Sequence, residues 1–367
     1  MKLLICGGGT GGHIYPALAA VTKLQDMGST AFLWIGTEGQ VEETLIPRAN
    51  LRLETIRGGA IAGVSLITKM ENAAKLIWSI GKANRLMADF RPDVLFMTGG
   101  YVNAPVALAA WLRRIPAAIY LPDIEPGMAI KALSRFTKRV ACTADDSAQY
   151  FPAGKTETTG YPVRPELRAA TRMTQAAALA EFDLSPERPT LFVFGGSRGA
   201  RSINRALMTI LPQLLDVVQV IHISGTLDWA EVEANARTLP ESSRASYRPF
   251  AYLHEEMAFA YRAADLVVAR AGASALGEFP AFGLPAILVP YPYAWRYQKV
   301  NADYLVERGA AVRINDEDLA TQLLPTALEL LVDEEKRQQM AQASRKLDTP
   351  DSAGKLARLL LRLGKEG

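Results

Sequence analysis

The amino-acid sequence predicts an α/β fold made of two Rossmann-like domains. One observation is that an apolar run ending in a glycine-rich loop, followed by a helical pattern, occurs near the N-terminus and again from residue 190. This order opens many nucleotide-binding parallel sheets. Another is the length of 367 residues, which suits two domains better than one core. We expect an N-terminal domain over residues 1–162, a second domain over 163–348, and a C-terminal helix over 349–367 that packs back across the domains.

Composition excludes several classes of function. Lys and Arg number 41 against 38 Asp and Glu, so a balanced surface argues against nucleic acid as the main partner. Cys6 and Cys142 fall in or beside strand-like runs and form no disulfide framework, which favours a reducing cytoplasm. The three histidines belong to no Cys/His cluster, so no metal is expected. Without a signal-peptide pattern or a run of about 18 apolar residues, we expect a soluble or peripheral protein.

The first predicted strand, residues 2–6, runs into the glycine-rich loop Gly7–Gly12 and then a helical pattern from Pro16 to Leu24. Glycines let the backbone approach a bulky ligand and supply positive φ where it is needed. A dinucleotide would favour an acid at the end of the second strand, residues 31–35, but Glu38 comes only after a Gly-Thr pair. This pattern disfavours NAD.

His13 closes the first glycine-rich loop just before the helix. A histidine there is ordinarily a cap or a packed side chain. At a loop mouth lined by glycines it can also meet a ligand, and histidine suits general-base work near neutral pH. We take His13 as the first candidate base.

A helical stripe covers residues 66–87. Most such stripes face a core, with solvated lysines around them. A minority lie on anionic membranes, where aromatic and aliphatic anchors sit beside cations. The stripe consists of Leu66, Met70, Ala74, Ile77 and Gly81, flanked by Lys69, Lys75, Trp78, Lys82 and Arg85.

Two further strand ends carry candidate site residues. The strand at 94–97 ends in a second glycine turn over residues 98–105, which feeds a helix. The strand at 117–120 opens into a loop holding Asp123 and Glu125. Acids at such a strand end can do acid–base chemistry, although Asp before a helix is as often an N-cap.

After a strand near 139–141, the segment Gly160–Pro165 carries two prolines and a glycine, which suits a linker between domains. We place the hinge there. Arg164 would then overlook a cleft between the domains, where a guanidinium can bind phosphate.

The second half repeats the opening pattern. A strand at 190–194 is followed by the loop Gly195–Asn204, whose successive N–H groups can cradle a diphosphate with help from the hydroxyl of Ser197. Next come a strand at 218–223 and one at 248–254, where an aromatic residue can stack on or frame a base. We interpret His222 and His254 as structural.

The segment Asp265–Asn301 predicts two adjacent strand-to-helix junctions, with strands at 266–269 and 286–289. Ligands of open parallel sheets bind at the carboxyl ends of strands. Glu278, one turn into the helix after the first junction, can accept hydrogen bonds from the vicinal hydroxyls of a ribose. The alternative is a solvated helix glutamate.

Taken together, these segments resemble the MurG family of glycosyltransferases. The motifs occur in the family's order and spacing over nearly the whole chain. They are GGGTGGHIYP (7–16), TGGYVNAP (98–105), GYPVR (160–164), FGGSRGARSIN (194–204), ARAGASALGE (269–278), GLPAILVPYP (283–292), and Gln298 with Asn301 and Ala302.

The resemblance implies a GT-B fold with an interdomain cleft. It implies transfer of N-acetylglucosamine from UDP-GlcNAc to undecaprenyl-pyrophosphoryl-N-acetylmuramoyl-pentapeptide, at the cytoplasmic face of the cell membrane. The second domain would bind the donor and the first a polyprenyl-pyrophosphate-linked acceptor, on an anionic membrane surface and with no cofactor.

Site residues are assigned on this basis. The candidate catalytic residues are His13, Asp123 and Glu125. UDP-GlcNAc would be bound by Thr10, Gly11, Gly12, Arg164, Gly196, Ser197, Arg198, Gly199, Tyr252, Leu253, Arg270, Ala273, Glu278 and Gln298. The acceptor would be bound by Gly100, Tyr101, Asn103 and Asp123.

The sequence departs from the family pattern in two places. Tyr120–Asp123 stands where the family has His-Glu-Gln-Asn, and Tyr297 with Gln298 stands where it has two glutamines. Three alternatives remain open: transfer to another lipid acceptor, UDP-GlcNAc 2-epimerase activity, and binding of a UDP-sugar without turnover.

Overall fold

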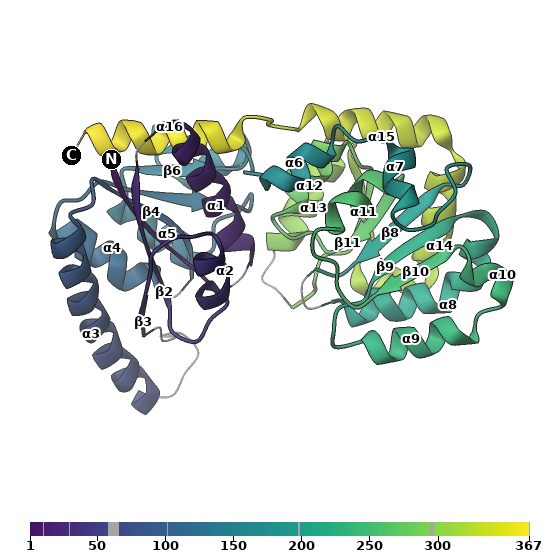
Figure 1. Cartoon of the computed structure of the whole chain (residues 1–367), viewed down its shortest axis with the longest axis horizontal. Coiled ribbons are helices and arrows are strands. Elements are labelled where there is room, and N and C mark those ends of the chain that lie inside the picture. Colours follow the sequence, from purple (N-terminus) through teal and green to yellow (C-terminus); the bar gives the residue numbers. More distant parts are fainter. Residues whose placement is uncertain are drawn as a thin grey trace. The chain divides into compact units, whose positions relative to one another are not determined.

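A computed structural model of the chain describes residues 1–9, 11–28, 30–57, 66–100, 102–196, 199–293 and 297–366, with the side chains of 66–74 left out. The chain divides into two compact units. Unit 1 comprises Met1–Arg164 and Asp351–Gly367, and unit 2 comprises Pro165–Pro350. Each unit is an α/β layer structure around one sheet (Figure 1). The prediction of two Rossmann-like α/β domains is confirmed.

The sheet of unit 1 is parallel in every described pairing and has the order β3-β2-β1-β4-β5-β6-β7. Its central strands are buried on both faces, which explains their near-continuous apolar runs. The strands are β1 (Lys2–Gly7), β2 (Ala31–Thr37), β3 (Leu53–Ile56), β4 (Val94–Gly99), β5 (Ala117–Leu121), β6 (Arg139–Cys142) and β7 (Thr156–Thr158).

Helices connect these strands and cover the sheet. They are α1 (Gly11–Asp26), α2 (Glu42–Arg48), α3 (Leu66–Phe90), α4 (Asn103–Leu112), α5 (Met128–Leu133), η1 (Ser134–Phe136), η2 (Asp145–Tyr150) and the C-terminal α16 (Ser352–Lys365). The apolar face of α16, which was expected to pack across both domains, is buried in the core of unit 1, where the helix lies beside α1 (Figure 1). Among the helices of the described residues, none combines the length and apolar character needed to cross a membrane.

Unit 2 has a second parallel sheet, of order β10-β9-β8-β11-β12-β13. Its strands are β8 (Thr190–Phe194), β9 (Gln219–Ile223), β10 (Tyr247–Phe250), β11 (Leu266–Ala269), β12 (Ala286–Leu288) and β13 (Ala311–Arg313). Its helices are α6 (Pro165–Ala170), α7 (Gln175–Ala180), α8 (Arg201–Val217), α9 (Trp229–Thr238), α10 (Glu241–Arg244), α11 (Met257–Ala263), α12 (Ala275–Phe282), α13 (Tyr297–Glu307), η3 (Asp316–Asp318), α14 (Leu319–Val332) and α15 (Glu334–Lys346).

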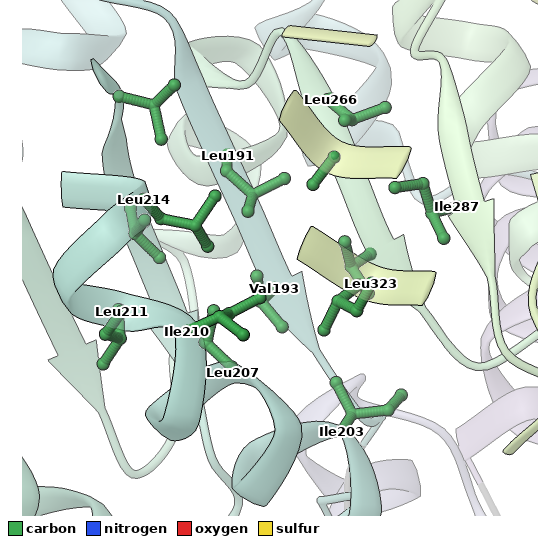
Figure 2. Close-up of a cluster of buried hydrophobic side chains, with 14 of the residues drawn as sticks. Leu191, Val193, Ile203, Leu207, Ile210, Leu211, Leu214, Leu266, Ile287 and Leu323 are labelled. Carbon is green, nitrogen blue, oxygen red and sulfur yellow. The ribbon is translucent and has the colours of Figure 1, made fainter. Parts of the chain in front are cut away.

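The apolar stripe of α8 fixes this helix on the second sheet. Figure 2 shows its leucine and isoleucine side chains gathered over Leu191 and Val193 of β8, with Leu323 of α14 beside them. Residues on one helix face recur every three or four positions, and Ile203, Leu207, Ile210, Leu211 and Leu214 follow that spacing. Packing of this helix therefore sets where its first turn lies.

The strand order places one switch point in each sheet. In unit 1 the order reverses between β1 and β4, and in unit 2 between β8 and β11. Ligands of open parallel sheets bind beside such points, at the carboxyl ends of the strands. Each switch point is flanked by glycine-containing loops that the sequence analysis singles out. A ligand is therefore expected at these loops.

Candidate functional site

Three hydrogen bonds hold the first glycine-rich loop in unit 1. The indole N–H of the buried Trp34 donates to the carbonyl of Gly7 at 2.9 Å. The amide of Gly8 donates to the carbonyl of Gly99 at 3.2 Å. The amide of Gly9 donates to Oε2 of Glu42 at 3.0 Å. The loop is thus tied to β2, β4 and α2 and has a defined backbone.

Glu42, which the sequence analysis does not single out, holds this loop. Its side chain is fully buried, and its other oxygen, Oε1, accepts from the amide of Thr37 at 2.9 Å. A Cβ on Gly8 would lie 1.8 Å from Oε1, and one on Gly36 would lie 2.6 Å from Cγ of Glu42. The two glycines therefore make the room this carboxylate occupies, and they were the only signal of it in the sequence.

His13, in the first turn of α1, faces the same loop. Its Nδ1 lies 3.1 Å from the carbonyl oxygen of Gly8. Because a carbonyl only accepts, Nδ1 carries the proton in this hydrogen bond, and Nε2 holds the lone pair of the neutral ring. A Cβ on Gly99 would lie 2.7 Å from Nε2. A glycine at the end of β4 is therefore required beside this ring.

The second glycine turn packs directly on the first. Gly100 has φ +99° and stands so close to Gly8 that a Cβ would lie 3.0 Å from the carbonyl oxygen of Gly8. Asn103 is fully buried in the first turn of α4, and neither polar atom of its amide has a hydrogen-bond partner among the described residues. Thr10 and Tyr101, which were also predicted to bind ligands, lie outside the described residues.

The loop after β5 brings Asp123 and Glu125 to the same edge of the sheet. Both are partly exposed. Tyr120, which replaces the family histidine, is buried inside β5, where its hydroxyl lies 2.9 Å from Oγ1 of Thr143 and donates to the carbonyl of Gly160 at 3.2 Å. Burial raises its pKa well above the ordinary value. Tyr120 therefore acts as a core residue, and the acids after it are what this loop offers to a ligand.

Arg164 ends unit 1. Its guanidinium carbon stands 4.8 Å from the centre of the Tyr15 ring, in cation–π contact with α1. Gly11 is also next to Tyr15, since a Cβ there would lie 2.9 Å from the ring. The structure thus places Arg164 beside the helix that carries His13.

In unit 2 two glycines of the loop after β8 have a constrained backbone. Gly196 has φ +87° and Gly199 has φ +78°, with the amide of Gly199 donating to the carbonyl of Gly196 at 3.0 Å. A Cβ on Gly199 would lie 2.2 Å from the carbonyl oxygen of Ser224. Ser197 and Arg198, two predicted donor ligands, lie outside the described residues.

A buried polar network holds the Ser224 carbonyl, against which Gly199 packs. His222 contacts the hydroxyl of Tyr247 through Nδ1 at 2.7 Å and Oδ1 of Asn204 through Nε2 at 3.0 Å. The Asn204 amide nitrogen donates to the carbonyl of Ser224 and to Oδ2 of Asp228, both at 2.9 Å. Burial lowers the pKa of His222 to about 3. His222 is thus a neutral structural residue, as the sequence interpretation had it.

Arg270, at the end of β11, is strongly bonded within the protein. It pairs with Asp316 and donates to the carbonyls of Val289 at 3.1 Å and Pro290 at 3.4 Å. Its Nη2 donates to Oγ of Ser202 at 2.8 Å. These bonds connect the loop after β12 to the first turn of α8. The carboxylate of Asp316 offsets much of the positive charge of Arg270, which was expected to bind a diphosphate.

The first turn of α13 ties two site loops together. The side-chain oxygen of Gln298 accepts from the amide of Tyr291 at 2.8 Å. Asn301 is fully buried and donates to the carbonyl of Ala271 at 3.1 Å. Ala273 is partly exposed in the same turn after β11. Gln298 therefore positions the loop after β12 with its oxygen, and its NH₂ group remains the part suited to a sugar hydroxyl.

Glu278 lies in α12, directly after the switch point, and is 8% exposed. The hydroxyl of Tyr261 donates to its Oε2 at 2.7 Å.

Tyr252 and Leu253 follow β10, the edge strand of the sheet, two strands from β8. Tyr252 is 44% exposed and Leu253 is 8% exposed. The strand expected over 248–254 ends at Phe250, so both residues belong to a loop.

The described residues contain no group of three His, Cys, Asp or Glu side chains arranged to hold a metal ion.

Comparisons with known proteins cover nearly the whole chain. The Glycosyltransferase family 28 N-terminal domain matches residues 3–142, and the family 28 C-terminal domain matches residues 190–356. The crystal structure of Acinetobacter baumannii MurG superposes with a TM-score of 0.79 at 27% identity, over 98% of this chain and 99% of that one. A UDP-N-acetylglucosamine--N-acetylmuramyl-(pentapeptide) pyrophosphoryl-undecaprenol N-acetylglucosamine transferase from Roseiflexus sp. is 40% identical, over 98% of this chain and 94% of that protein. The chain belongs to the MurG family.

Other MurG-family relatives also match the chain over its full length. Proteins with the same full name from Listeria welshimeri and Lactococcus lactis are 36% and 35% identical, each over 100% of both chains. A UDP-GlcNAc 2-epimerase from Neisseria meningitidis, solved with UDP-GlcNAc bound, has a TM-score of 0.70 at 13% identity, which concerns the fold alone. The chain is thus a GT-B glycosyltransferase.

The predicted site residues fall into two groups. Unit 1 brings His13 together with the two glycine turns, because β1 and β4 are neighbours. In unit 2 the end of β8, where Gly195 and Gly196 follow, lies beside the end of β11, after which the chain leads to Glu278, because β8 and β11 are neighbours. Tyr252 stands apart from this second group, on the far side of β9.

Proposed function

We propose that this protein transfers N-acetylglucosamine from UDP-GlcNAc to undecaprenyl-pyrophosphoryl-N-acetylmuramoyl-pentapeptide, with inversion at the anomeric carbon. The observation that carries the proposal is the full-length similarity to proteins named for this reaction. The two switch-point sites supply the chemistry that the reaction needs.

Unit 2 is the proposed donor-binding unit. The backbone N–H groups of the Gly195–Gly199 loop, before α8, would donate hydrogen bonds to the diphosphate, together with the predicted ligands Ser197 and Arg198. Glu278 would accept hydrogen bonds from the ribose hydroxyls, with Tyr252 and Leu253 framing the uracil. Ala273 and the NH₂ group of Gln298 would contact the ribose-phosphate and the hexosamine.

Unit 1 is the proposed acceptor-binding unit and supplies the base. The acceptor pyrophosphate would lie against the second glycine turn, near Gly100, Tyr101 and Asn103. The buried amide of Asn103, which no described residue satisfies, can donate to a phosphate oxygen and accept from a bridging water. Asp123 would bind a hydroxyl of the acceptor sugar.

His13 is the first candidate for the base. The acceptor hydroxyl oxygen forms a bond to the anomeric carbon while the bond from that carbon to the UDP oxygen breaks. The hydroxyl proton passes to Nε2, and the bonding pair leaves with UDP. Nδ1, which donates to Gly8, keeps the ring in the tautomer this step requires. Asp123 and Glu125 are the second candidates.

Charge that grows on the departing diphosphate must meet preorganised donors. The Gly195–Gly199 amides are assigned this task, with Thr10, Gly11, Gly12 and Arg164 as further donor ligands. Arg270 belongs in this proposal mainly as the residue that positions the loop after β12, because Asp316 already pairs with it.

The acceptor is lipid-linked, so we propose that unit 1 docks on an anionic membrane surface, at the cytoplasmic side. Ile77 and Trp78 of α3 are 71% and 50% exposed, and Trp111 and Leu112 at the end of α4 are 56% and 66% exposed. Lys82 lies over the Trp78 ring at 5.5 Å. Exposed aromatic and aliphatic side chains beside cations are typical of membrane-surface helices. The predicted stripe thus faces solvent at Ile77.

The test is transfer of labelled sugar from UDP-GlcNAc to a panel of polyprenyl-pyrophosphoryl acceptors. We expect a β-linked product with the N-acetylmuramoyl-pentapeptide acceptor and none with acceptors lacking that sugar. Product with a different lipid-linked sugar only would move the protein to another acceptor. Formation of the 2-epimer from UDP-GlcNAc alone would favour an isomerase, and binding without either product would favour a binding protein.

A further inference from the structure

We propose that Glu42 is a positioning residue for the reaction, and that it acts on His13 through the single peptide group between Gly8 and Gly9. The inference rests on the proposed function, in which His13 is the base. It assigns a role to a buried acid that the mechanism above does not use.

The geometry of the relay lies in one peptide plane. The Gly9 amide donates to Oε2 of Glu42 at 3.0 Å. The carbonyl of the same peptide group, that of Gly8, accepts from Nδ1 of His13 at 3.1 Å. Peptide N–H and C=O groups belong to one conjugated unit. Glu42, the peptide and His13 therefore form a continuous hydrogen-bonded chain, with the carboxylate at one end and the base at the other.

The hydrogen bonds from His13 to Glu42 polarise one another in one direction. An ionised acceptor strengthens the hydrogen bond it receives, and bonds in series polarise one another. Negative charge on Glu42 therefore makes the Gly8 carbonyl a better acceptor for the Nδ1 proton. That favours the tautomer with its lone pair on Nε2, and it stabilises positive charge on the ring once Nε2 takes a proton.

The surroundings support a role beyond anchoring the loop. Both Glu42 oxygens accept backbone N–H groups, the second from Thr37 at 2.9 Å, which is the pattern of an ionised carboxylate. The side chain is fully buried. Burying a charge is costly unless it is well satisfied.

The field of this carboxylate reaches its neighbours. The pKa of the buried Cys6 thiol is raised first by burial and second by the charge of Glu42. The loop is also built to admit the carboxylate, since any side chain on Gly8 would overlap Oε1. The carboxylate thus lies in direct hydrogen-bond contact with the Gly8–Gly9 peptide.

The test reads the tautomer of His13 by NMR of the full-length protein labelled with ¹⁵N-histidine. The chain has only three histidines, so substitution of His222 or His254 assigns the signals. We expect wild-type His13 to carry its proton on Nδ1. Wild-type His13 with its proton on Nε2 would overturn the relay, without need of any variant and whatever the transfer assay shows.

Glu42→Gln then removes the charge while keeping the shape. We expect a mixture of both His13 tautomers and a fall in kcat of roughly 10- to 100-fold, less than the loss of about 10⁴-fold when a carboxylate that directly orients a catalytic histidine is replaced. The KM for UDP-GlcNAc should change little. Glu42→Asp, which keeps the charge with a shorter reach, should recover part of both losses, and it serves as the test variant if the glutamine variant does not fold.

Trp34→Phe is the matched control, because it frees the Gly7 carbonyl of the same loop and leaves the Gly8–Gly9 peptide alone. It should lower the melting temperature but leave the His13 tautomer unchanged. A tautomer shift equal to that of Glu42→Gln would reduce Glu42 to a loop anchor. If His13→Ala kept full turnover while the tautomer effects held, the base assignment would fail and the hydrogen-bond relay would stand.

Discussion

The hydroxyl of Tyr261 donates a hydrogen bond of 2.7 Å to Oε2 of Glu278. Tyr261 lies in α11, and its ring contacts the rings of Phe192, Phe194 and Phe279. The carboxylate proposed to recognise ribose is therefore oriented by an aromatic cluster in the core of unit 2.

Substitution of Glu278 tests this arrangement. Glu278→Ala should weaken UDP binding by about 10- to 100-fold, because a hydrogen bond to a charged group contributes about 1.5–3 kcal/mol. Tyr261→Phe, which keeps the ring and loses only the orienting bond, should weaken binding less. Calorimetry with UDP and 2′-deoxy-UDP checks the contact. Wild type should prefer UDP, and Glu278→Ala should bind both alike; a retained preference would place Glu278 away from the 2′-hydroxyl.

The buried His222 predicts a pH effect on stability. Burial lowers its pKa in the folded protein from the ordinary 6.5 to about 3. Between these values the unfolded chain binds more protons, so stability is full above pH 6.5 and is lost as pH falls below it. Between pH 7 and pH 5, protonation of this group should lower the free energy of unfolding by about 2 kcal/mol. His222→Gln should be less stable at pH 7 but should lose less on acidification, measured by thermal unfolding. Equal losses in both proteins would refute this origin.

The loop after β8 gives a matched pair of glycine substitutions. Gly196→Ala meets nothing within 4 Å and should cost only the strain of a positive φ, about 1–2 kcal/mol. Gly199→Ala adds a contact at 2.2 Å with the Ser224 carbonyl oxygen, a backbone atom that the Asn204 network holds in place. The melting temperature should fall in the order wild type, Gly196→Ala, Gly199→Ala. Equal values for the two variants would show that the Ser224 loop yields freely.

Membrane docking through α3 is tested with vesicles of anionic lipid. The double variant Ile77→Asp and Trp78→Ala should lower vesicle binding about tenfold or more, since each large apolar side chain contributes about 1.5–3 kcal/mol when buried. Leu227→Asp, at a side chain 66% exposed in unit 2, is the control for loss of an exposed apolar residue. Cosedimentation measures both. If only the Leu227→Asp control lost vesicle binding, the docking surface would lie around Leu227 and not on α3.

The strands were predictable because their periodicity and their glycine-rich ends are local signals. The strands at Thr190–Phe194 and Leu266–Ala269 have the bounds that the sequence predicts. The first helix begins at Gly11 instead of Pro16, because the Gly11–His13 segment after the loop already takes helical hydrogen bonding. Such an early start has no signal in residue propensity, since glycine disfavours helices.

The missed site features depend on contacts between segments distant in the chain. Glu42 looks like any helix glutamate until the fold brings Gly9 to it. Arg270 looked available to a phosphate, but Asp316, 46 residues later, pairs with it. Tyr120 looked like a change at the site, yet its position in β5 turns its ring into the core. Side-chain partners of this kind follow from sheet order and not from local sequence.

The most direct test of the account is a crystal structure of the protein with UDP. We predict that the diphosphate lies on the amides of the Gly195–Gly199 loop and that the ribose hydroxyls contact Glu278, both at the carboxyl ends of β8 and β11. A nucleotide bound away from the carboxyl ends of β8 and β11 would contradict it.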